Sequence, residues 1–268
     1  MESVSFTVNG QTAAVDPSHP HLLSALREEL GIMSPKDGCS PSGQCGACTV
    51  LLDGKAIQSC LVSLEKATDS EITTLEGFDE SERVRLANAF ASAGALQCGF
   101  CTPGIMVRTK ALLDAKGRDL DLQTVKSRLG AHLCRCTGYT KILDAVDLLV
   151  EDTVPLPQVP DAVGDDGAKY EGIELALGDR GYVDDIRPEG LLHAALKLTD
   201  HARADIERID TTAAESAPGV VGVFTAADVP GQLRIGIIHE DWPVFIPEAG
   251  RTSFLGDALA IVVADTKV

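Results

Sequence analysis

The sequence predicts an α+β protein with two small domains, a linker and a partial third domain. Three observations carry this prediction. Strand and helix patterns alternate over residues 1–76, and helical patterns alone fill residues 77–152. A proline-rich stretch at 153–172 then separates these two domains from an α/β pattern over 173–268. A chain of 268 residues is long enough for two or three such domains.

The first domain begins with a hairpin signal. Apolar and polar residues alternate over 3–8, and the Asn9-Gly10 pair is typical of a two-residue turn. Leucines follow at helical spacing, and Gly31 stands where that helix should end. The predicted elements are strands over 3–8 and 12–15, a helix over 21–30, and strands over 48–53, 56–62 and 71–74. The strand over 56–62 is expected to run through Cys60.

The second domain reads as a small bundle of four helices. They are expected over residues 81–93, 102–116, 122–133 and 139–150. Thr102-Pro103 is a good pair for an N-cap and a first helical position. Four cysteines lie at the ends of these helices, so the bundle is expected to hold a metal site between helix termini.

The third region follows the linker, whose prolines stand at positions 155, 157 and 160. We expect strands over 191–198, 220–224, 234–238 and 258–263, and a short helix over 211–217. The strand over 258–263 is strongly apolar and only five residues follow it. We therefore expect this last domain to be incomplete as given.

Composition and charge exclude some classes of function. The formal net charge of −17 argues against nucleic-acid binding, because phosphate binding needs a positive surface. No run of about 18 apolar residues is present, so no transmembrane helix is expected. The N-terminal residues resemble a strand and lack the features of a signal peptide. The expected location is the cytoplasm, where thiols bind metals or do redox chemistry more often than they form disulfides.

The eight cysteines form two sets of four with none left over. The first set is Cys39, Cys45, Cys48 and Cys60. Its three loop cysteines and one later cysteine resemble the spacing of plant-type ferredoxins, with one residue more between the first two. Glycines at 38, 43 and 46 suit a loop that wraps a cluster. A zinc site is the alternative, but zinc sites usually pair two short knuckles and this set has one.

The second set is Cys98, Cys101, Cys134 and Cys136. Two close pairs separated by about 32 residues fit zinc and iron–sulfur clusters equally well, so spacing alone leaves this choice open.

The residues around the cysteines resolve this choice between zinc and an iron–sulfur cluster. GQCGACTV (43–50), QCGFCTPG (97–104) and LCRCTGY (133–139) strongly resemble the iron–sulfur portion of the molybdenum hydroxylases, the xanthine dehydrogenase and aldehyde oxidoreductase family. Residues 173–268, including GYVDDI (181–186) and GDALAIVVAD (256–265), resemble the start of that family's molybdenum-binding portion. The resemblance implies a β-grasp ferredoxin-like [2Fe–2S] domain over 1–76, a four-helix-bundle [2Fe–2S] domain over 77–152, and a partial α/β hammerhead domain over 173–268.

The resemblance also implies roles for residues. The first cysteine set would hold an outer cluster, and the second set an inner cluster nearer to molybdenum. Gln97 and Cys136 would lie against the pterin of the molybdopterin cofactor. The family's base is a glutamate that we expect beyond residue 268, so no residue here is assigned a catalytic role. Any FAD is expected on a separate chain, because the linker leads directly to the hammerhead segment.

The implied function is electron transfer within a molybdenum-dependent oxidoreductase. The expected partners are a molybdenum-binding chain that completes the hammerhead domain and a flavoprotein subunit, in a hetero-oligomer that could be dimerised. Neither nucleic acid nor a membrane is expected as a partner. Two alternatives remain at this point: a free-standing carrier with two clusters and no molybdenum partner, and a zinc-bearing structural module. The six histidines do not cluster with carboxylates at metal spacing.

Overall fold

A computed structural model describes residues 3–158, 160–164 and 167–266. It contains two compact units, Met1–Asp184 and Asp185–Val268, and each is described by itself. Parts of the predicted linker, residues 159 and 165–166, lie outside the described residues.

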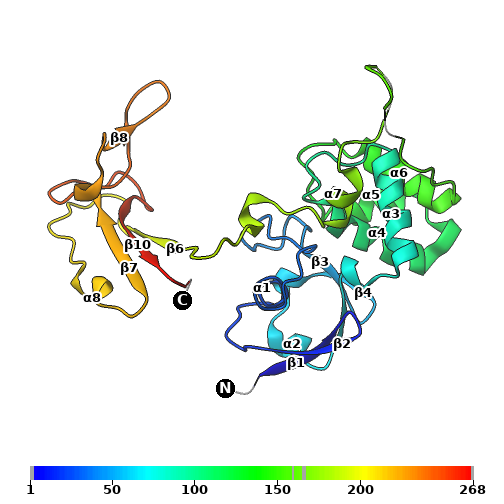
Figure 1. The fold of residues 1–268 in the computed structure, drawn as a ribbon, viewed down its shortest axis with the longest axis horizontal. Helices are drawn as coiled ribbons and strands as arrows, with labels where there is room; N and C mark the ends of the chain where they lie inside the picture. The colour runs from blue at the N-terminus through cyan, green and yellow to red at the C-terminus, as the bar shows by residue number, and fades with distance from the viewer. Residues whose placement is uncertain (1–2, 159, 165–166, 267–268) are drawn as a thin grey trace. The chain divides into compact units, whose positions relative to one another are not determined.

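The first unit opens with a five-stranded sheet (Figure 1). Its strands are β1 (Val4–Val8), β2 (Gln11–Val15), β3 (Thr49–Leu52), β4 (Lys55–Gln58) and β5 (Glu71–Thr73). Their order is β2-β1-β5-β3-β4, with β1 parallel to β5 and every other pair antiparallel. Asn9 and Gly10 both have positive φ, as the predicted two-residue turn requires. Four of the five predicted strands are confirmed within one residue at each end.

The helix expected over 21–30 forms in two parts. It starts as α1 (Leu22–Ser24) and widens into a π-helical turn (Ala25–Glu29), in which the Leu30 N–H donates to the Ala25 carbonyl. Leu22 and Leu26 are fully buried and share a core with Phe6 of β1. The apolar face predicted for this segment is therefore confirmed. The short helix α2 (Leu64–Ala67), capped by the Ser63 side chain, was not expected.

The predicted strand through Cys60 is wrong. Strand β4 ends at Gln58, and Ser59–Leu61 forms a 3₁₀ turn. The Ser59 N–H and hydroxyl both donate to the Cys48 carbonyl, at 3.2 and 2.8 Å. These two bonds turn the chain back and bring Cys60 beside Cys48. The other 3₁₀ turns span Leu75–Gly77, Gly117–Asp119, Val183–Asp185 and Ala226–Asp228.

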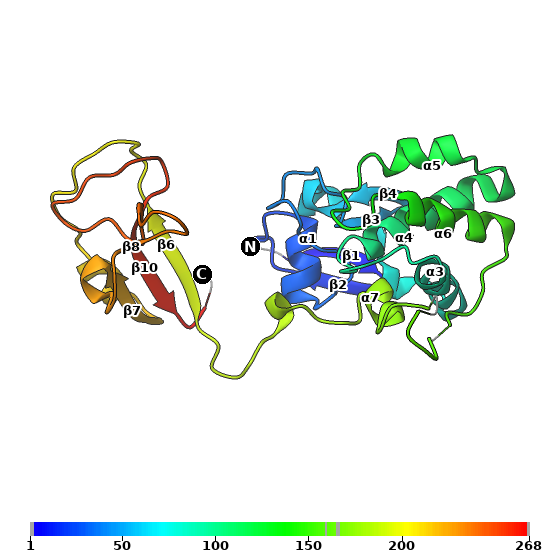
Figure 2. The ribbon, with the colours of Figure 1, turned by 90° about the horizontal axis from the view of Figure 1, so that it is seen from above.

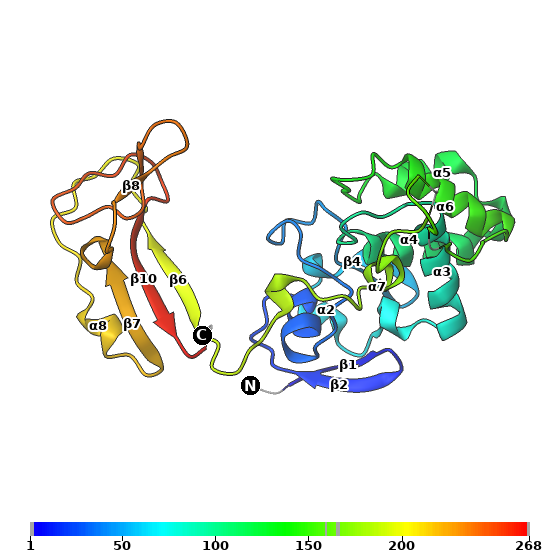
Figure 3. The same cartoon turned by 45° about the horizontal axis from the view of Figure 1, so that its top comes forward.

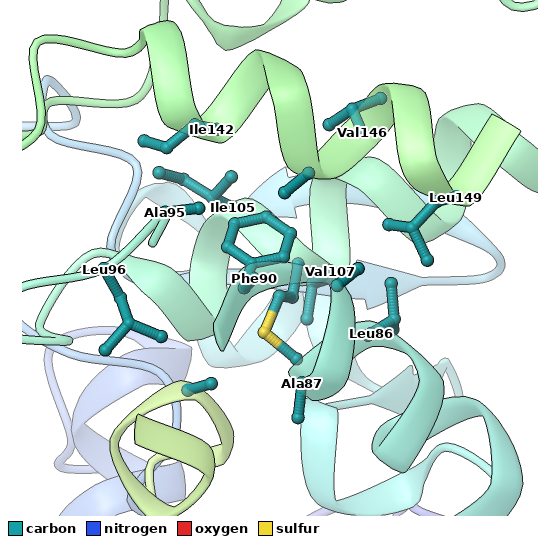
Figure 4. Close-up of a cluster of buried hydrophobic side chains, with 14 of the residues drawn as sticks. Leu86, Ala87, Phe90, Ala95, Leu96, Ile105, Val107, Ile142, Val146 and Leu149 are labelled. Atoms are coloured by element: carbon teal, nitrogen blue, oxygen red, sulfur yellow. The ribbon is translucent and has the colours of Figure 1, made fainter. Parts of the chain in front are cut away.

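Helices form the second half of this unit (Figure 2). They are α3 (Glu80–Ser92), α4 (Thr102–Lys116), α5 (Leu122–Leu129), α6 (Thr140–Glu151) and α7 (Gly172–Leu177). Phe90 lies at the centre of their core, with Ile105 and Ile142 around it (Figure 4). All three side chains are fully buried, and burial of such side chains contributes roughly 1.5–3 kcal/mol each.

Two helix boundaries differ from the prediction. Helix α5 ends at Leu129 instead of 133, because the Leu133 N–H donates to the Cys45 carbonyl at 2.9 Å and the chain leaves the helix to reach it. The N-cap of α4 is Cys101, and Thr102 is already its first residue.

The segment that follows the linker begins within the first unit. Residues 173–184, which the sequence analysis expects to open the third domain, pack with the first unit in the structure. The reason is that Leu175, Ala176 and Leu177 of α7 are buried in the core of the helical half.

The second unit contains a three-stranded antiparallel sheet in the order β6-β10-β7 (Figure 3). Its elements are β6 (His193–Leu198), α8 (Thr212–Glu215), β7 (Val220–Thr225), β8 (Arg234–Ile235), β9 (Trp242–Pro243) and β10 (Ala258–Ala264). The strand predicted over 234–238 is therefore shorter, since β8 pairs with only the two residues of β9. Among the described residues, no helix is both long enough and apolar enough to cross a membrane.

Candidate metal centres

The first cysteine set is built on a loop between the π-helical turn and β3. Cys39, Cys45 and Cys48 lie on this loop, and the Lys36 N–H closes it by donating to the Ala47 carbonyl at 3.0 Å. Gly46 has a φ of +67°, and a Cβ there would lie 2.4 Å from the Ala131 carbonyl oxygen. This position therefore requires glycine, both for its backbone conformation and for its close contact with the helical half.

The loop supplies N–H groups to its first thiol. Ser42 N–H donates to Cys39 Sγ at 3.3 Å. Although partial burial raises the pKa of the Cys39 thiol, hydrogen bonds from Ser42, Gln44 and Cys45 outweigh it and lower that pKa to about 6. The loop thus stabilises a thiolate before any metal is bound, which is the form that ligates iron.

The thiols of the first set meet as two pairs. Cys39 interacts with Cys45, and Cys48 interacts with Cys60. The second pair is buried against Leu23. Burial, together with the neighbouring Cys60, raises the pKa of the Cys48 thiol to about 12. Such a thiol ionises readily only when a nearby cation, such as a bound metal ion, stabilises the thiolate.

The second set lies at the starts of two helices. Cys98 and Cys101 precede α4, and Cys134 and Cys136 precede α6. Cys136 Sγ lies 3.6 Å from Cys98 Sγ, and Cys101 interacts with Cys134. Burial and then the Cys134 charge raise the pKa of the Cys101 thiol. This set is therefore also arranged as two pairs.

Thr137 and Tyr139 hold Cys134 in place, and sequence analysis assigned neither residue this role. Although burial raises the pKa of the Cys134 thiol, the Thr137 hydroxyl and N–H, at 3.2 and 3.4 Å from Sγ, lower it on balance. The Tyr139 hydroxyl accepts from the Cys134 N–H at 2.9 Å and donates to the His132 carbonyl. The φ of Tyr139 is +71°, which is rare for a residue other than glycine. The signal was available in the motif, since both residues belong to CTGY (136–139).

Zinc and a [2Fe–2S] cluster differ in how they use four thiolates. Across the residues with described positions, no three His, Cys, Asp or Glu side chains gather closely enough to hold one ion. A structural zinc site needs four ligands around a single ion, at about 2.3 Å for sulfur. A [2Fe–2S] cluster instead takes two protein ligands on each of its two irons. Each set supplies the four thiols that a [2Fe–2S] cluster requires.

The two sets lie close together within the first unit. The Leu133 N–H, next to Cys134, donates to the carbonyl of Cys45. A hollow of about 270 Å³ is lined by Cys45 and by all four cysteines of the second set. His132 is buried between the two halves and its Nε2 accepts from Arg108 Nε at 3.3 Å. His132 therefore packs between the two halves of the unit.

Gln97 and Cys136, the two residues expected against the pterin, lie together. The Gln97 side-chain amide donates to the Cys136 carbonyl at 3.1 Å. Gln97 and Cys98 are both exposed in the first unit. The inner site is thus open on the side where these residues lie.

Comparison with protein-family models accounts for most of the chain. Residues 6–75 match a model described as a 2Fe-2S iron-sulfur cluster binding domain, and residues 74–147 match a [2Fe-2S] binding domain. Residues 177–268 match the a/b hammerhead domain of aldehyde oxidase and xanthine dehydrogenase. The chain is therefore an iron–sulfur protein with two cluster-binding domains.

Individual relatives agree with this class. The chain is 35% identical to an aldehyde oxidoreductase of Megalodesulfovibrio gigas over 97% of its own length and 31% of that protein. It is 42% identical to the nicotinate dehydrogenase small FeS subunit of Eubacterium barkeri, over 56% of this chain and 95% of that subunit. The crystal structure of the aldehyde oxidoreductase from Desulfovibrio desulfuricans matches with a TM-score of 0.84 and 34% identity, over 99% of this chain and 32% of that one.

These matches confirm the resemblance found in the sequence. The chain belongs to the molybdenum hydroxylase family of aldehyde oxidoreductases and xanthine dehydrogenases. It spans about a third of the length of the aldehyde oxidoreductases that it matches.

Proposed function

We propose that this chain is the electron-transfer portion of a molybdenum hydroxylase, in which two [2Fe–2S] clusters relay single electrons from a molybdopterin centre on a partner chain to a flavin or an external acceptor. The observation that carries the proposal is the close approach of two four-thiolate sets within one compact unit. One backbone hydrogen bond joins the loops that bear them. The domain order that goes with it is a β-grasp ferredoxin-like domain, a four-helix bundle and a partial hammerhead domain.

In this proposal each cysteine set holds one cluster. Cys39, Cys45, Cys48 and Cys60 ligate the outer cluster, and the loop N–H groups around Cys39 offset the negative charge of the thiolates. Cys98, Cys101, Cys134 and Cys136 ligate the inner cluster. Thr137 and Tyr139 fix the position and charge of Cys134.

Gln97 and Cys136 form the contact with the pterin. The hydrogen bond between them fixes the backbone of the ligand loop at its exposed side. A polar side chain held in this way can orient a cofactor without moving the cluster ligands. The molybdopterin itself would be held by a partner chain that completes the hammerhead domain, in a hetero-oligomer. A flavoprotein subunit would be a further partner.

A free-standing carrier with two clusters is the competing function. The hammerhead match over residues 177–268 argues against it, because a carrier without a molybdenum partner has no use for that domain. The proposed setting is the cytoplasm, since all eight thiols are free and each has a place in a metal site.

Two serine variants test the ligand assignment. Cys60→Ser should remove or alter the paramagnetic signal of one reduced cluster, and Cys136→Ser the signal of the other. The structure predicts that each variant keeps the untouched signal, because the two sets share no cysteine. Loss of both signals in each variant, with folded protein, would refute the assignment of two separate centres.

A further inference from the structure

The segment that leads out of the first unit lies against the loop of the inner cysteine set. Residues 172–182, here called the strap, comprise α7 and the residues that follow it. The first unit continues to Asp184, so all of the strap belongs to it. The turn from Cys98 to Cys101 joins two cysteines of this set. The strap contacts its first three residues, which are Cys98, Gly99 and Phe100.

Each of the three contacts is direct. The Tyr182 hydroxyl donates to the Cys98 carbonyl oxygen at 2.6 Å. The Tyr182 ring meets the Phe100 ring edge to face, with 5.6 Å between the centroids. A Cβ on Gly99, whose φ is +77°, would lie 2.9 Å from the Cβ of Leu175. The strap therefore contacts each of the residues from Cys98 to Phe100.

The strap is itself held firmly. Leu175 is 3% exposed and belongs to the core of the helical half. Lys36 is also buried, at 3% exposure, and its Nζ lies over the Tyr182 ring at 5.7 Å from the centroid. Phe100 in turn packs against Gly38, the residue before Cys39. The contacts of Tyr182 thus reach the neighbourhood of both cysteine sets.

We infer that Tyr182 is a positioning residue of the inner cluster: its hydroxyl fixes the Cys98 carbonyl, and the strap thereby sets the geometry and the reduction equilibrium of that cluster. This inference rests on the proposed function, since it takes Cys98 and Cys101 as cluster ligands. Hydrogen bonds, charge and exposure around a cluster all tune its potential. The hydroxyl proton compensates the negative end of the Cys98 carbonyl, so its removal disfavours the reduced, more negative cluster.

The test is a redox titration of Tyr182→Phe, monitored by electron paramagnetic resonance on the natively purified protein with any chains that accompany it. Tyr182→Phe removes only the hydroxyl. We expect the equilibrium constant for reducing the inner cluster to fall about three- to tenfold, the upper value being about 59 mV for one electron. The outer cluster should be unchanged. Tyr170→Phe is the matched control, because Tyr170 is 82% exposed and lies just before the strap.

A second readout does not depend on potentials. The rate at which a chelator removes iron should rise several-fold for the inner cluster of Tyr182→Phe, and not for Tyr170→Phe. Should Tyr182→Phe take up no iron at all, Leu175→Val decides, because it shortens the side chain over Gly99 by one methylene. Faster iron loss from the inner cluster alone would then support the inference.

The outcomes separate the inference from the proposed function. Wild-type protein without cluster signals would overturn the proposed function. Two normal clusters in the wild type, with the same inner potential and the same iron loss in Tyr182→Phe and Tyr170→Phe, would overturn only the role of Tyr182. Equal shifts in both clusters would also overturn it, because the Tyr182 hydroxyl donates to the carbonyl of Cys98, a ligand of the inner set.

Discussion

Gly104 is the point at which helix α4 touches the loop of the first cysteine set. A Cβ at this position would lie 2.6 Å from the Gly46 carbonyl oxygen and 3.1 Å from that of Ala47. Both neighbours are backbone atoms between Cys45 and Cys48, so neither can yield without moving a proposed ligand. Gly104→Ala must therefore push α4 away from the loop.

The magnitude follows from two opposed contributions. Overpacking against rigid neighbours costs up to about 3 kcal/mol. Alanine in place of glycine returns at most about 1 kcal/mol of helix propensity. The net loss is about 2 kcal/mol, which lowers the melting temperature of a unit of this size by roughly 4–8 °C.

The assay combines thermal unfolding with the magnetic coupling between the two reduced clusters, which depends on their separation. The control is Gly172→Ala, where the new Cβ would meet Ala91 and Lys169 at an ordinary 3.7 Å. We expect the control to be at least as stable as the wild type, because its new contacts are ordinary and alanine favours the helix. Gly104→Ala with wild-type stability and unchanged coupling would refute the view that this contact fixes the two halves.

Three further predictions follow from single contacts. Arg85→Met should destabilise the first unit by about 1 kcal/mol in denaturant unfolding, because Arg85 donates to the Leu149 carbonyl at 2.7 Å near the end of α6; the exposed Arg118→Met is the control, and equal midpoints would contradict the prediction. Asp121 caps α5, and hydrogen bonds from Thr124 lower its pKa from 3.8 to about 2. Its contribution is therefore complete above pH 3.8 and lost as the pH falls toward 2; Asp121→Asn should unfold with a weaker pH dependence in that window, and an identical dependence would count against the cap. Gln97→Ala should lower the molybdopterin content of the purified complex while its iron content stays constant, and unchanged molybdopterin would exclude Gln97 as a cofactor contact.

The sequence predicted those parts of the fold that depend on local patterns. The Asn9-Gly10 turn, the apolar face of residues 21–30 and the four long helices all follow from spacing and turn chemistry. The breaks in those patterns come from contacts far away in sequence. Strand β4 stops before Cys60 because Ser59 bonds to the Cys48 carbonyl, and α5 ends early because Leu133 bonds to Cys45. Neither partner can be read from local periodicity.

The candidate site was also predictable only in part. The ligand role of the eight cysteines could be predicted from their spacing and from the residues around them, because metal ligands must be particular residue types. The residues that hold those ligands could not be named, since many side chains can supply a hydroxyl. Thr137 and Tyr139 lay inside a motif that the sequence had already singled out. Tyr182 is 84 residues from its partner Cys98, and only the folded chain brings the two together.

The most direct test of the account is metal analysis with electron paramagnetic resonance of the natively purified, dithionite-reduced protein. The account predicts about four irons per chain and two distinct [2Fe–2S] signals, with molybdenum in the same purified assembly. Four irons without molybdenum or a partner would contradict the hydroxylase assignment and leave a free-standing carrier. Zinc with no paramagnetic signal would contradict electron transfer altogether.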